Sequence, residues 1–251
     1  MEAYSSFAQV YDLFMDNIPY KKWSRYLISL LHAQGVKDGI VAELGCGTGQ
    51  MTRLLRDAGY DMIGIDMSPD MLGVAREKEQ EGDESILYLQ QDMREFELYG
   101  TVAAIVSVCD SLNYLTNPDD LLKVFKLAKN YLDPGGVMIF DINTRHYYSH
   151  VLGDSTVCEN RDEGSFIWEN EWNDTTFINS SYLTIYHKIE NDGEELYERL
   201  EEEHRQRGYT SGEILHYARR AGLTPVNIYE AFTKKAPGRT CERMYFVLQN
   251  V

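Results

Sequence analysis

A glycine-rich stretch follows a short apolar run in the sequence VAELGCGTGQ, at positions 41–50. Gly45, Gly47 and Gly49 alternate there with other residues. Glycine loses more conformational freedom on folding than any other residue, and a ligand that must approach the main chain closely would justify that cost. The G-x-G-x-x-G fingerprint of dinucleotide binding is broken, because Gln50 stands where its third glycine would be. The stretch therefore predicts a ligand-binding turn of another kind, and a glycine-rich turn that binds nothing is the alternative.

Two aspartates further along the chain could complete a nucleoside site. Asp66 ends a second apolar run, 21 residues after Gly45, where a carboxylate can accept hydrogen bonds from ribose hydroxyls. Asp92 ends a third strand candidate, where a carboxylate could accept from an adenine amino group. Each aspartate alone is also explained as a helix cap. Together with the glycines they fall at the carboxyl ends of successive strands, where open α/β sheets bind ligands.

Strand and helix patterns alternate along the chain and can bring these residues together. The apolar runs that predict strands, with helices between them, are 40–44, 62–65, 86–89, 102–108 and 137–142. Two more strands, 226–232 and 244–248, follow a helix that the Thr210–Glu213 capping box opens. Continuous apolar strands separated by helices are typical of a parallel sheet covered on both faces. The expected fold class is therefore α/β.

The pattern changes over residues 143–209, which are polar and rich in tyrosine, tryptophan and glutamate. The segments SFIWENEW and YLTIYHKI alternate apolar and polar side chains, which predicts antiparallel strands with one covered face. The segment GEELYERLEEEHRQR favours a helix by propensity alone. We interpret 1–142 and 210–251 as one domain and 143–209 as an insertion in it.

Composition and the absence of certain sequence patterns argue against several classes of protein. The 251 residues are 43% hydrophobic and carry a net charge of −16, which disfavours a large nucleic-acid footprint. There is no signal-peptide pattern, no apolar run of the roughly 20 residues that span a bilayer, and no C-x-x-C pair among four cysteines. We expect a cytoplasmic protein with reduced thiols. His146 and His150 have i, i+4 spacing, but no motif completes a metal site, so none is expected.

Five segments occur in the order and spacing of the class I S-adenosylmethionine-dependent methyltransferases, namely VAELGCGTGQ, GIDMSPDML, QQDMREF, VCDSLNYL and YLDPGGVMIFDIN. The chain resembles that family over essentially its whole length. It is most similar to small-molecule enzymes with a β insertion after strand five, such as glycine and sugar N-methyltransferases. The resemblance implies a Rossmann-like seven-stranded sheet with helices on both faces, and an antiparallel β insertion that forms a lid. It also implies that 195–207 is a strand, against its propensity.

The resemblance implies S-adenosylmethionine as the cofactor and assigns residues to its methionine end. Glu43 would lie near the amino group of the methionine part. The backbone of Gly45, Cys46 and Gly47 would pass beneath the cofactor. Cys109, just after strand four, would offer its backbone to the methionyl part.

The adenosine end is assigned in the same way. Asp66 would bind the ribose and Met67 would stack on the adenine. Asp92 and Met93 would meet the edge and the face of the adenine. Two aromatic residues near the N-terminus would close over the cofactor, Tyr4 and Tyr11.

Methyl transfer from a sulfonium is an in-line displacement, so the enzyme must chiefly position the acceptor and exclude water. A neutral amine needs little more than the loss of a proton, whereas a hydroxyl needs a base. By resemblance Asp110 and Tyr114, in CDSLNYL, face the methyl group, and His204 in the insertion is a third catalytic candidate. A turn cap for Asp110 and a solvent-facing strand position for His204 are the alternatives.

The function implied is methyl transfer to a small-molecule acceptor, an amine or a hydroxyl. Neither NPPY nor DPPY stands after strand four, and this absence, with the acidic net charge, argues against enzymes that methylate bases of DNA or RNA. The acidic insertion also lacks the basic rim that an RNA or protein methyltransferase would need. An RNA or protein methyltransferase and a non-catalytic S-adenosylmethionine-binding module remain the alternatives. No membrane partner is expected, and the oligomeric state is open between monomer and dimer.

Overall fold

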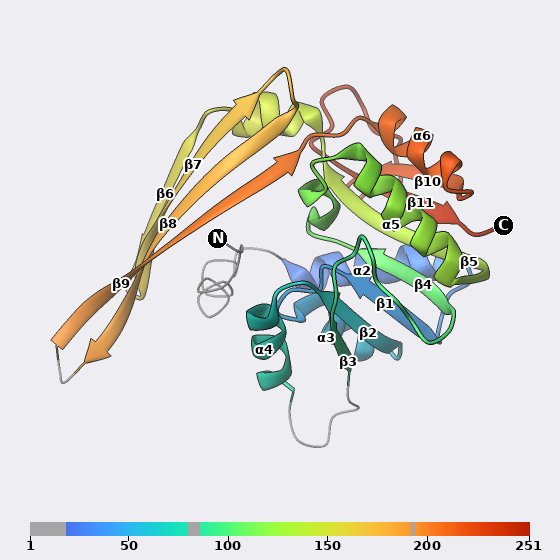
Figure 1. The fold of residues 1–251 in the computed structure, drawn as a ribbon, viewed down its shortest axis with the longest axis horizontal. Helices are drawn as coiled ribbons and strands as arrows, with labels where there is room; N and C mark the ends of the chain where they lie inside the picture. The colour runs from blue at the N-terminus through green and yellow to red at the C-terminus, as the bar shows by residue number, and fades with distance from the viewer. Residues whose placement is uncertain (1–18, 80–85, 192–193) are drawn as a thin grey trace.

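A seven-stranded sheet forms the centre of the molecule, in the order β10–β11–β5–β4–β1–β2–β3 (Figure 1). The computed structural model describes residues 19–79, 86–191 and 194–251. The strands are β1 (Ile40–Leu44), β2 (Asp61–Asp66), β3 (Leu87–Gln90), β4 (Val102–Ser107), β5 (Leu132–Asn143), β10 (Thr224–Glu230) and β11 (Arg243–Gln249). β11 is antiparallel to both of its neighbours, and the other pairs are parallel. The α/β sheet expected from the sequence is confirmed.

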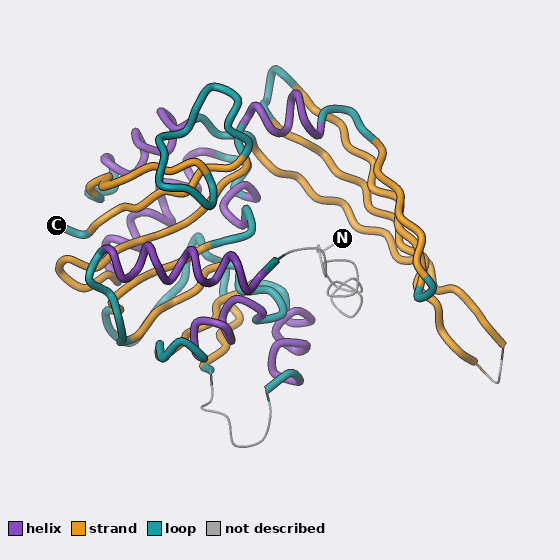
Figure 2. Tube along the Cα trace, turned by 180° about the vertical axis from the view of Figure 1, so that it is seen from behind, coloured by secondary structure: helices purple, strands orange, loops and turns teal. Residues whose placement is uncertain are grey.

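Helices cover both faces of this sheet, as Figures 1 and 2 show from opposite sides. They are α2 (Tyr20–Ala33), α3 (Gln50–Arg56) and α4 (Pro69–Glu77) on one face, and α5 (Pro118–Tyr131) and α6 (Ser211–Arg220) on the other. Side chains alternate along each strand between two buried clusters, because successive residues of a strand point to opposite faces. On β5, Phe140 belongs to the buried cluster that includes side chains of α5 and α6, and Ile139 belongs to the cluster that includes side chains of α2, α3 and α4.

The helix starts follow the capping signals in the sequence. Ser68 caps α4 by accepting a hydrogen bond from the amide of Met71, at 3.2 Å, and Pro69 is the first helical residue. Thr210 and Glu213 form both halves of the capping box that opens α6. These local signals therefore fix where two of the covering helices begin.

β5 differs from its expected bounds. The sequence predicts a break at DPGG and a strand from 137, whereas β5 begins at Leu132, directly after α5. The pairing with β4 is interrupted there, because the register shifts between Val102 and Ala104. Gly136 suits this place, because a Cβ on it would lie 3.0 Å from the carbonyl oxygen of Ala103. The glycines thus produce an irregularity in the strand and do not end it.

A second sheet, formed by β6 (Thr156–Arg161), β7 (Gly164–Asn173), β8 (Ile178–Asn191) and β9 (Glu194–Arg207), extends from the body as an arm (Figures 1 and 2). We call this sheet the lid. All its pairs are antiparallel, and the short helix η2 (Tyr147–Leu152) connects it to β5. β9 pairs with β8 along its whole length, so tertiary pairing overrides its helical propensity. The strand expected at 195–207 is confirmed.

The chain order across the central sheet reverses between β1 and β4. From β1 the chain builds outward through β2 and β3, then returns to place β4 on the other side of β1. A crevice outside the carboxyl ends of the strands forms at such a switch point. β11 runs in the opposite direction, so its first residue, Arg243, lies at the same edge. No helix in the described part of the chain combines the length and hydropathy needed to cross a membrane.

Candidate active site

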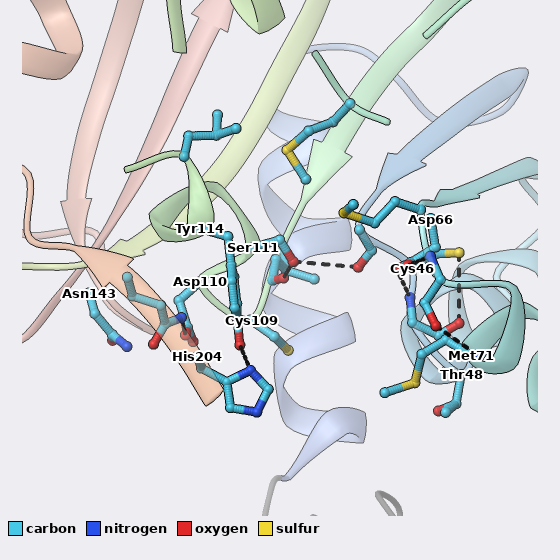
Figure 3. A pocket seen from close by; sticks show the side chains of 18 of the residues that line it. Cys46, Thr48, Asp66, Met71, Cys109, Asp110, Ser111, Tyr114, Asn143 and His204 are labelled. Atoms are coloured by element: carbon cyan, nitrogen blue, oxygen red, sulfur yellow. Dashed lines mark hydrogen bonds between the residues drawn. The ribbon is translucent and has the colours of Figure 1, made fainter. Parts of the chain in front are cut away.

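A cavity of about 820 Å³ opens at the carboxyl ends of β1 to β4, between this edge of the sheet and the lid (Figure 3). Its cofactor side, as we call it, comes from the segments that follow β1, β2 and β3. Its acceptor side comes from the end of β5, η2, the lid and the start of β11. The turn after β4, which includes the short helix η1 (Ser111–Tyr114), lies between the two sides. The switch point of the sheet thus holds the ligand cavity.

The three glycines after β1 serve different purposes. All have positive φ, which favours glycine. A Cβ on Gly45 would lie 2.7 Å from the Ser111 side chain, and one on Gly49 would lie 2.4 Å from the Tyr88 hydroxyl. A Cβ on Gly47, which lines the cavity, would meet no described residue within 4 Å. Gly47 therefore leaves room for a ligand, whereas packing within the protein requires glycine at positions 45 and 49.

Asp66 projects from the end of β2 toward the glycine turn. Its Oδ2 accepts a hydrogen bond from the amide of Gly47 at 2.8 Å, and its Oδ1 accepts from the amide of Ser68 at 2.9 Å. Burial raises the pKa of Asp66, although these amides act to lower it. Each oxygen uses one lone pair in this way and keeps another for a ligand. The carboxylate is therefore fixed in orientation and remains able to accept two hydroxyl hydrogens.

Glu43 lies at the buried end of β1, with 2% of its surface exposed. The Thr52 hydroxyl donates to its Oε2 at 2.6 Å. Burial raises the pKa of Glu43 to about 8, and Asp66 adds to the shift while Thr52 opposes it. A cation beside this carboxyl group would favour its ionised form. The site is thus complementary to an ammonium group.

The aspartate after β3 has a partner within the chain. Arg94 donates to both oxygens of Asp92 through its side chain, with the Nε at 2.9 Å from each. Burial acts to raise the pKa of Asp92, but the hydrogen bonds and charge of Arg94 outweigh it and lower the pKa. Met93 lines the cavity, and so does Met67, which is 62% exposed. An adenine amino group that met Asp92, as expected, would therefore share its carboxylate with Arg94.

Of the four remaining residues expected to contact the cofactor, the structure describes two. Cys46 and Cys109 both line the cavity, and Figure 3 shows Cys46 beside Asp66. Burial is the largest cause that raises the pKa of each thiol. Tyr4 and Tyr11, expected to close over the cofactor, lie outside the described residues.

The turn after β4 contains two successive residues in the left-handed region, Cys109 with φ 59° and Asp110 with φ 53°. Non-glycine residues rarely adopt this conformation, and it tends to persist where the surroundings hold it. Here Asp110 accepts hydrogen bonds from Gln206 Nε2 on β9 and from Arg243 Nη2 on β11, each at 2.7 Å. Both carboxylate oxygens are thus engaged. The geometry favours a positioning role for Asp110 over that of a general base.

Arg243 is a central residue of the site that the sequence analysis missed. It pairs with Asp110 and with the buried Asp141, and its guanidinium lies 5.0 Å from the ring centroid of Trp23. Burial would lower the pKa of Arg243, but the two carboxylates outweigh it and hold the pKa above its usual range. Burial raises the pKa of Asp141 to about 6, although Arg243 opposes the shift. The sequence signal that could have found Arg243 is its place at the start of the last strand, because an antiparallel last strand begins at the edge where the parallel strands end.

Asn113 was also missed. Its amide nitrogen donates to the carbonyl oxygens of Asn143, at 2.9 Å, and Arg207, at 2.8 Å. Its side-chain oxygen accepts from the amide of Asn143 at 3.0 Å. One buried side chain thus ties the turn after β4 to the end of β5 and to the end of the lid. No local sequence pattern distinguishes it from an ordinary turn asparagine.

Tyr114 and His204 come together from segments far apart in the sequence. The Tyr114 hydroxyl lies 3.3 Å from His204 Nδ1, and both residues line the cavity (Figure 3). His204 is only 8% exposed, so the solvent-facing alternative for it is wrong. Burial lowers the pKa of His204 to about 4. The imidazole is therefore neutral near pH 7.

Comparison with known proteins places the chain in a family. A family model described as "Methyltransferase domain" matches residues 41–136. YqeM of Bacillus subtilis (strain 168), named as a methyltransferase, is 33% identical over 98% of this chain and 96% of its own length. The crystal structure of an S-adenosylmethionine-dependent methyltransferase from Clostridium acetobutylicum ATCC 824 is 30% identical, with a TM-score of 0.86 and 98% of each chain covered. The chain belongs to the S-adenosylmethionine-dependent methyltransferases.

A relative with a more specific name covers half of this methyltransferase. The dTDP-3-amino-3,4,6-trideoxy-alpha-D-glucopyranose N,N-dimethyltransferase of Streptomyces venezuelae is 29% identical over 136 residues, 53% of this chain and 56% of its own. The Rossmann-like fold, the enzyme class and the cofactor expected from the sequence are confirmed by the family.

The described residues of the methyltransferase fit S-adenosylmethionine. The room above Gly47 would accept the body of the cofactor, as no described residue fills it. The buried carboxyl group of Glu43 suits an ammonium group, and the two oxygens of Asp66 suit a pair of hydroxyls. The donor set thus matches the charged and polar groups of the cofactor.

Proposed function

We propose that this enzyme transfers the methyl group of S-adenosylmethionine to the nitrogen of a small-molecule amine. In this proposal residues 1–142 and 210–251 form the cofactor-binding domain, and 143–209 encloses the acceptor. The support for an enclosed acceptor is that the lid lines the same cavity as the glycine turn. A cavity of about 820 Å³ suits a small ligand better than a polymer. The net charge of −16 opposes RNA as the substrate.

The cofactor side would hold S-adenosylmethionine through the residues that its geometry favours. Glu43 would face the ammonium of the methionine part, Asp66 would hold the ribose hydroxyls, and Gly47 would let the main chain pass closely beneath. When bound, the cofactor supplies the methyl group, whose bond to sulfur breaks, with its electron pair staying on sulfur, as the bond from the acceptor nitrogen forms. Everything else that the reaction needs is positioning and the exclusion of water.

The observation that carries an amine acceptor is the weakness of the bases on the acceptor side. A hydroxyl acceptor must lose its proton to a base during transfer. Asp110 is held in an ion pair with Arg243 and also accepts a hydrogen bond from Gln206, and His204 has a pKa of about 4. Neither group, among the described residues, suits the deprotonation of an alcohol. A neutral amine already carries the lone pair that attacks the methyl carbon.

Tyr114 and His204 would orient that lone pair. Because the buried imidazole stays neutral near pH 7, the pair offers hydrogen-bond acceptors to an amine N–H without repelling it. An imidazole with a pKa of about 4 is too weak a base to retain the proton of an ammonium group. The pair therefore acts by orientation, and the proton lost by the amine passes to water.

Charge near the acceptor side also favours an amine. Two carboxylates, Asp110 and Asp141, surround the single guanidinium of Arg243. This cluster has a surplus negative charge when Asp141 is ionised, and it attracts a cationic acceptor. Attraction of this kind concentrates amines on the acceptor side of the cavity before one loses its proton.

Matched pairs of amines and alcohols test the proposal. Initial rates of methyl transfer are measured with benzylamine against benzyl alcohol and with propylamine against propanol, at pH 8. We expect transfer to the amines at rates at least tenfold above those to the alcohols. Faster transfer to the alcohols, or transfer to neither while the cofactor binds, would overturn the proposal.

A further inference from the structure

We propose that the natural acceptor joins its amine to an apolar body and carries no phosphate or other anionic group. This inference rests on the proposed function and names the substrate class of the same site. It separates this enzyme from its Streptomyces relative, whose name describes a nucleotide sugar as substrate.

The lid offers an apolar wall to the cavity. Phe166 and Trp168 on β7, with Leu183 and Ile185 on β8, all line it. They occupy alternate positions of neighbouring strands and pair directly, Phe166 with Ile185 and Trp168 with Leu183. Their side chains therefore share one face of the lid. Such a surface recognises an apolar group by removing it from water.

Among the residues of this face that line the cavity, polarity is graded along the lid. Glu202, which pairs with Leu183 on this face, does not line the cavity. Nearest the body, Ser181 on β8 is paired with His204 on β9, and Gln206 follows toward the end of the strand. Leu183 and Ile185 lie farther along β8, away from the body. A bound molecule would thus place its polar end beside Tyr114 and His204 and its apolar end against the lid. The transfer site and the apolar wall are parts of one continuous cavity.

The described residues that line the cavity offer an anionic group no cation that is not already paired with a carboxylate. Among the described residues that line it, only Arg94 and Arg243 are basic at neutral pH. Arg94 is bound by Asp92 and lies 3.6 Å from Asp120. Arg243 is bound by Asp110 and by Asp141, as set out above. A diphosphate would have to displace a carboxylate from one of these arginines, and a desolvated phosphate without a cationic partner is costly.

Calorimetry on the full-length enzyme saturated with S-adenosylhomocysteine tests the inference. The probes are 3-phenylpropylamine, propylamine and a nucleoside-diphosphate amino sugar. We expect 3-phenylpropylamine to bind at least tenfold more tightly than propylamine, because both carry the same charged group and only one has an apolar body. The nucleotide sugar should give no measurable heat of binding.

Trp168→Ala supplies the second arm of this test. It should weaken the binding of 3-phenylpropylamine about tenfold, with propylamine unchanged, because only the apolar contact is lost. Tyr182→Ala is the matched control, since Tyr182 is exposed on the opposite face of β8. An unchanged affinity for S-adenosylhomocysteine shows that each variant is folded.

Four results would overturn the inference. Tight binding of the nucleotide sugar would overturn it while leaving N-methylation of a small molecule standing. Equal affinity for the two simple amines, or equal effects of Trp168→Ala and Tyr182→Ala, would do the same. The failure of both amines to bind and to be methylated would overturn the proposed function as well.

Discussion

At the scale of single residues, Gly47 and Gly49 differ in what an added side chain would contact. A Cβ on Gly49 would clash with the Tyr88 hydroxyl at 2.4 Å, whereas a Cβ on Gly47 would enter open cavity. Both residues have positive φ, so alanine adds roughly 1–2 kcal/mol of backbone strain at either. We expect Gly49→Ala to lower the melting temperature more than Gly47→Ala does. Gly47→Ala should cause the larger loss of S-adenosylhomocysteine affinity relative to its loss of stability.

Thermal unfolding and calorimetry on the two variants measure these effects. Gly59→Ala serves as a control, since Gly59 has positive φ and an added Cβ would meet nothing within 4 Å, but it does not line the cavity. Cofactor affinity that is unchanged in Gly47→Ala would show that the ligand does not approach this part of the main chain.

Glu43 links stability to pH in the cofactor-free enzyme. Its pKa in the folded state is about 8, above the value of 4.5 expected in the unfolded chain. Between these values the folded state binds a proton that the unfolded state lacks, so the free energy of unfolding falls as pH rises through this window. Glu43→Gln cannot titrate. We expect the melting temperature of the wild type to fall more steeply between pH 6 and pH 9 than that of Glu43→Gln. Parallel curves would mean that Glu43 is ionised throughout.

Tyr114 tests whether orientation limits the rate. Tyr114→Phe removes the hydroxyl that lies 3.3 Å from His204 Nδ1 and leaves the ring. We expect kcat/KM with an amine to fall roughly 10- to 100-fold, the range associated with misplaced reactants. The affinity for S-adenosylhomocysteine should change by less than about 1 kcal/mol, because no cofactor contact is removed. Tyr217→Phe on α6 is the control. A loss confined to cofactor affinity would assign Tyr114 to the cofactor.

At the scale of elements, the attachment of the lid to the sheet is the feature that the structure adds. Gln206 at the end of β9 donates to Asp110 at 2.7 Å. A hydrogen bond to a carboxylate is worth about 1.5–3 kcal/mol. We expect Gln206→Ala to lower kcat/KM with little change in cofactor affinity. In a double-mutant cycle on the free energy of unfolding, Gln206→Ala and Asp110→Ala should be coupled by about that amount.

Arg205→Ala provides the comparison for this cycle. Arg205 is the neighbour of Gln206 on β9 but is exposed on the opposite face. Its effect should add to that of Asp110→Ala without coupling. Additivity in both cycles would show that the contact between Gln206 and Asp110 contributes nothing to holding the lid.

Elements with local signals were predictable from the sequence. The caps of α4 and α6 and the apolar strands of the sheet follow from residues adjacent in the chain. β9 did not follow from its own composition, because Glu, Leu and Arg favour a helix and only pairing with β8 makes it a strand. Its identification came from resemblance to a family.

The site was predictable where its residues follow directly from the ends of predicted strands. Strand-end residues such as Gly47 and Asp66 lie where parallel strands must place them. Arg243 and Asn113 were missed because their partners come from the turn after β4, from β5 and from β9, and no spacing along the chain records those contacts. The sequence also could not show that Gln206 and Arg243 bind the carboxylate of Asp110. It therefore offered no means of testing whether Asp110 is a base.

At the scale of the whole molecule, the proposed function divides the reaction between two sheets, with the cofactor at the switch point and the acceptor under the lid. The central sheet carries the cofactor side of the cavity, and the lid carries most of its acceptor side. The turn after β4 connects them through Asp110, Asn113 and Tyr114. An acidic molecule with a partly apolar cavity is suited to a small cationic acceptor. The central claim is therefore that the methyl group goes to the nitrogen of such a molecule.

The most direct test is to follow the methyl group. The full-length enzyme is incubated with S-adenosylmethionine labelled as trideuteromethyl and with a bacterial cell extract separated into small-molecule, protein and RNA fractions. Mass spectrometry then locates the label, with incubation without enzyme as the control. We predict a labelled small molecule whose fragments place the trideuteromethyl group on nitrogen. Label recovered only in protein or RNA, or attached to oxygen in a small molecule, would contradict the account.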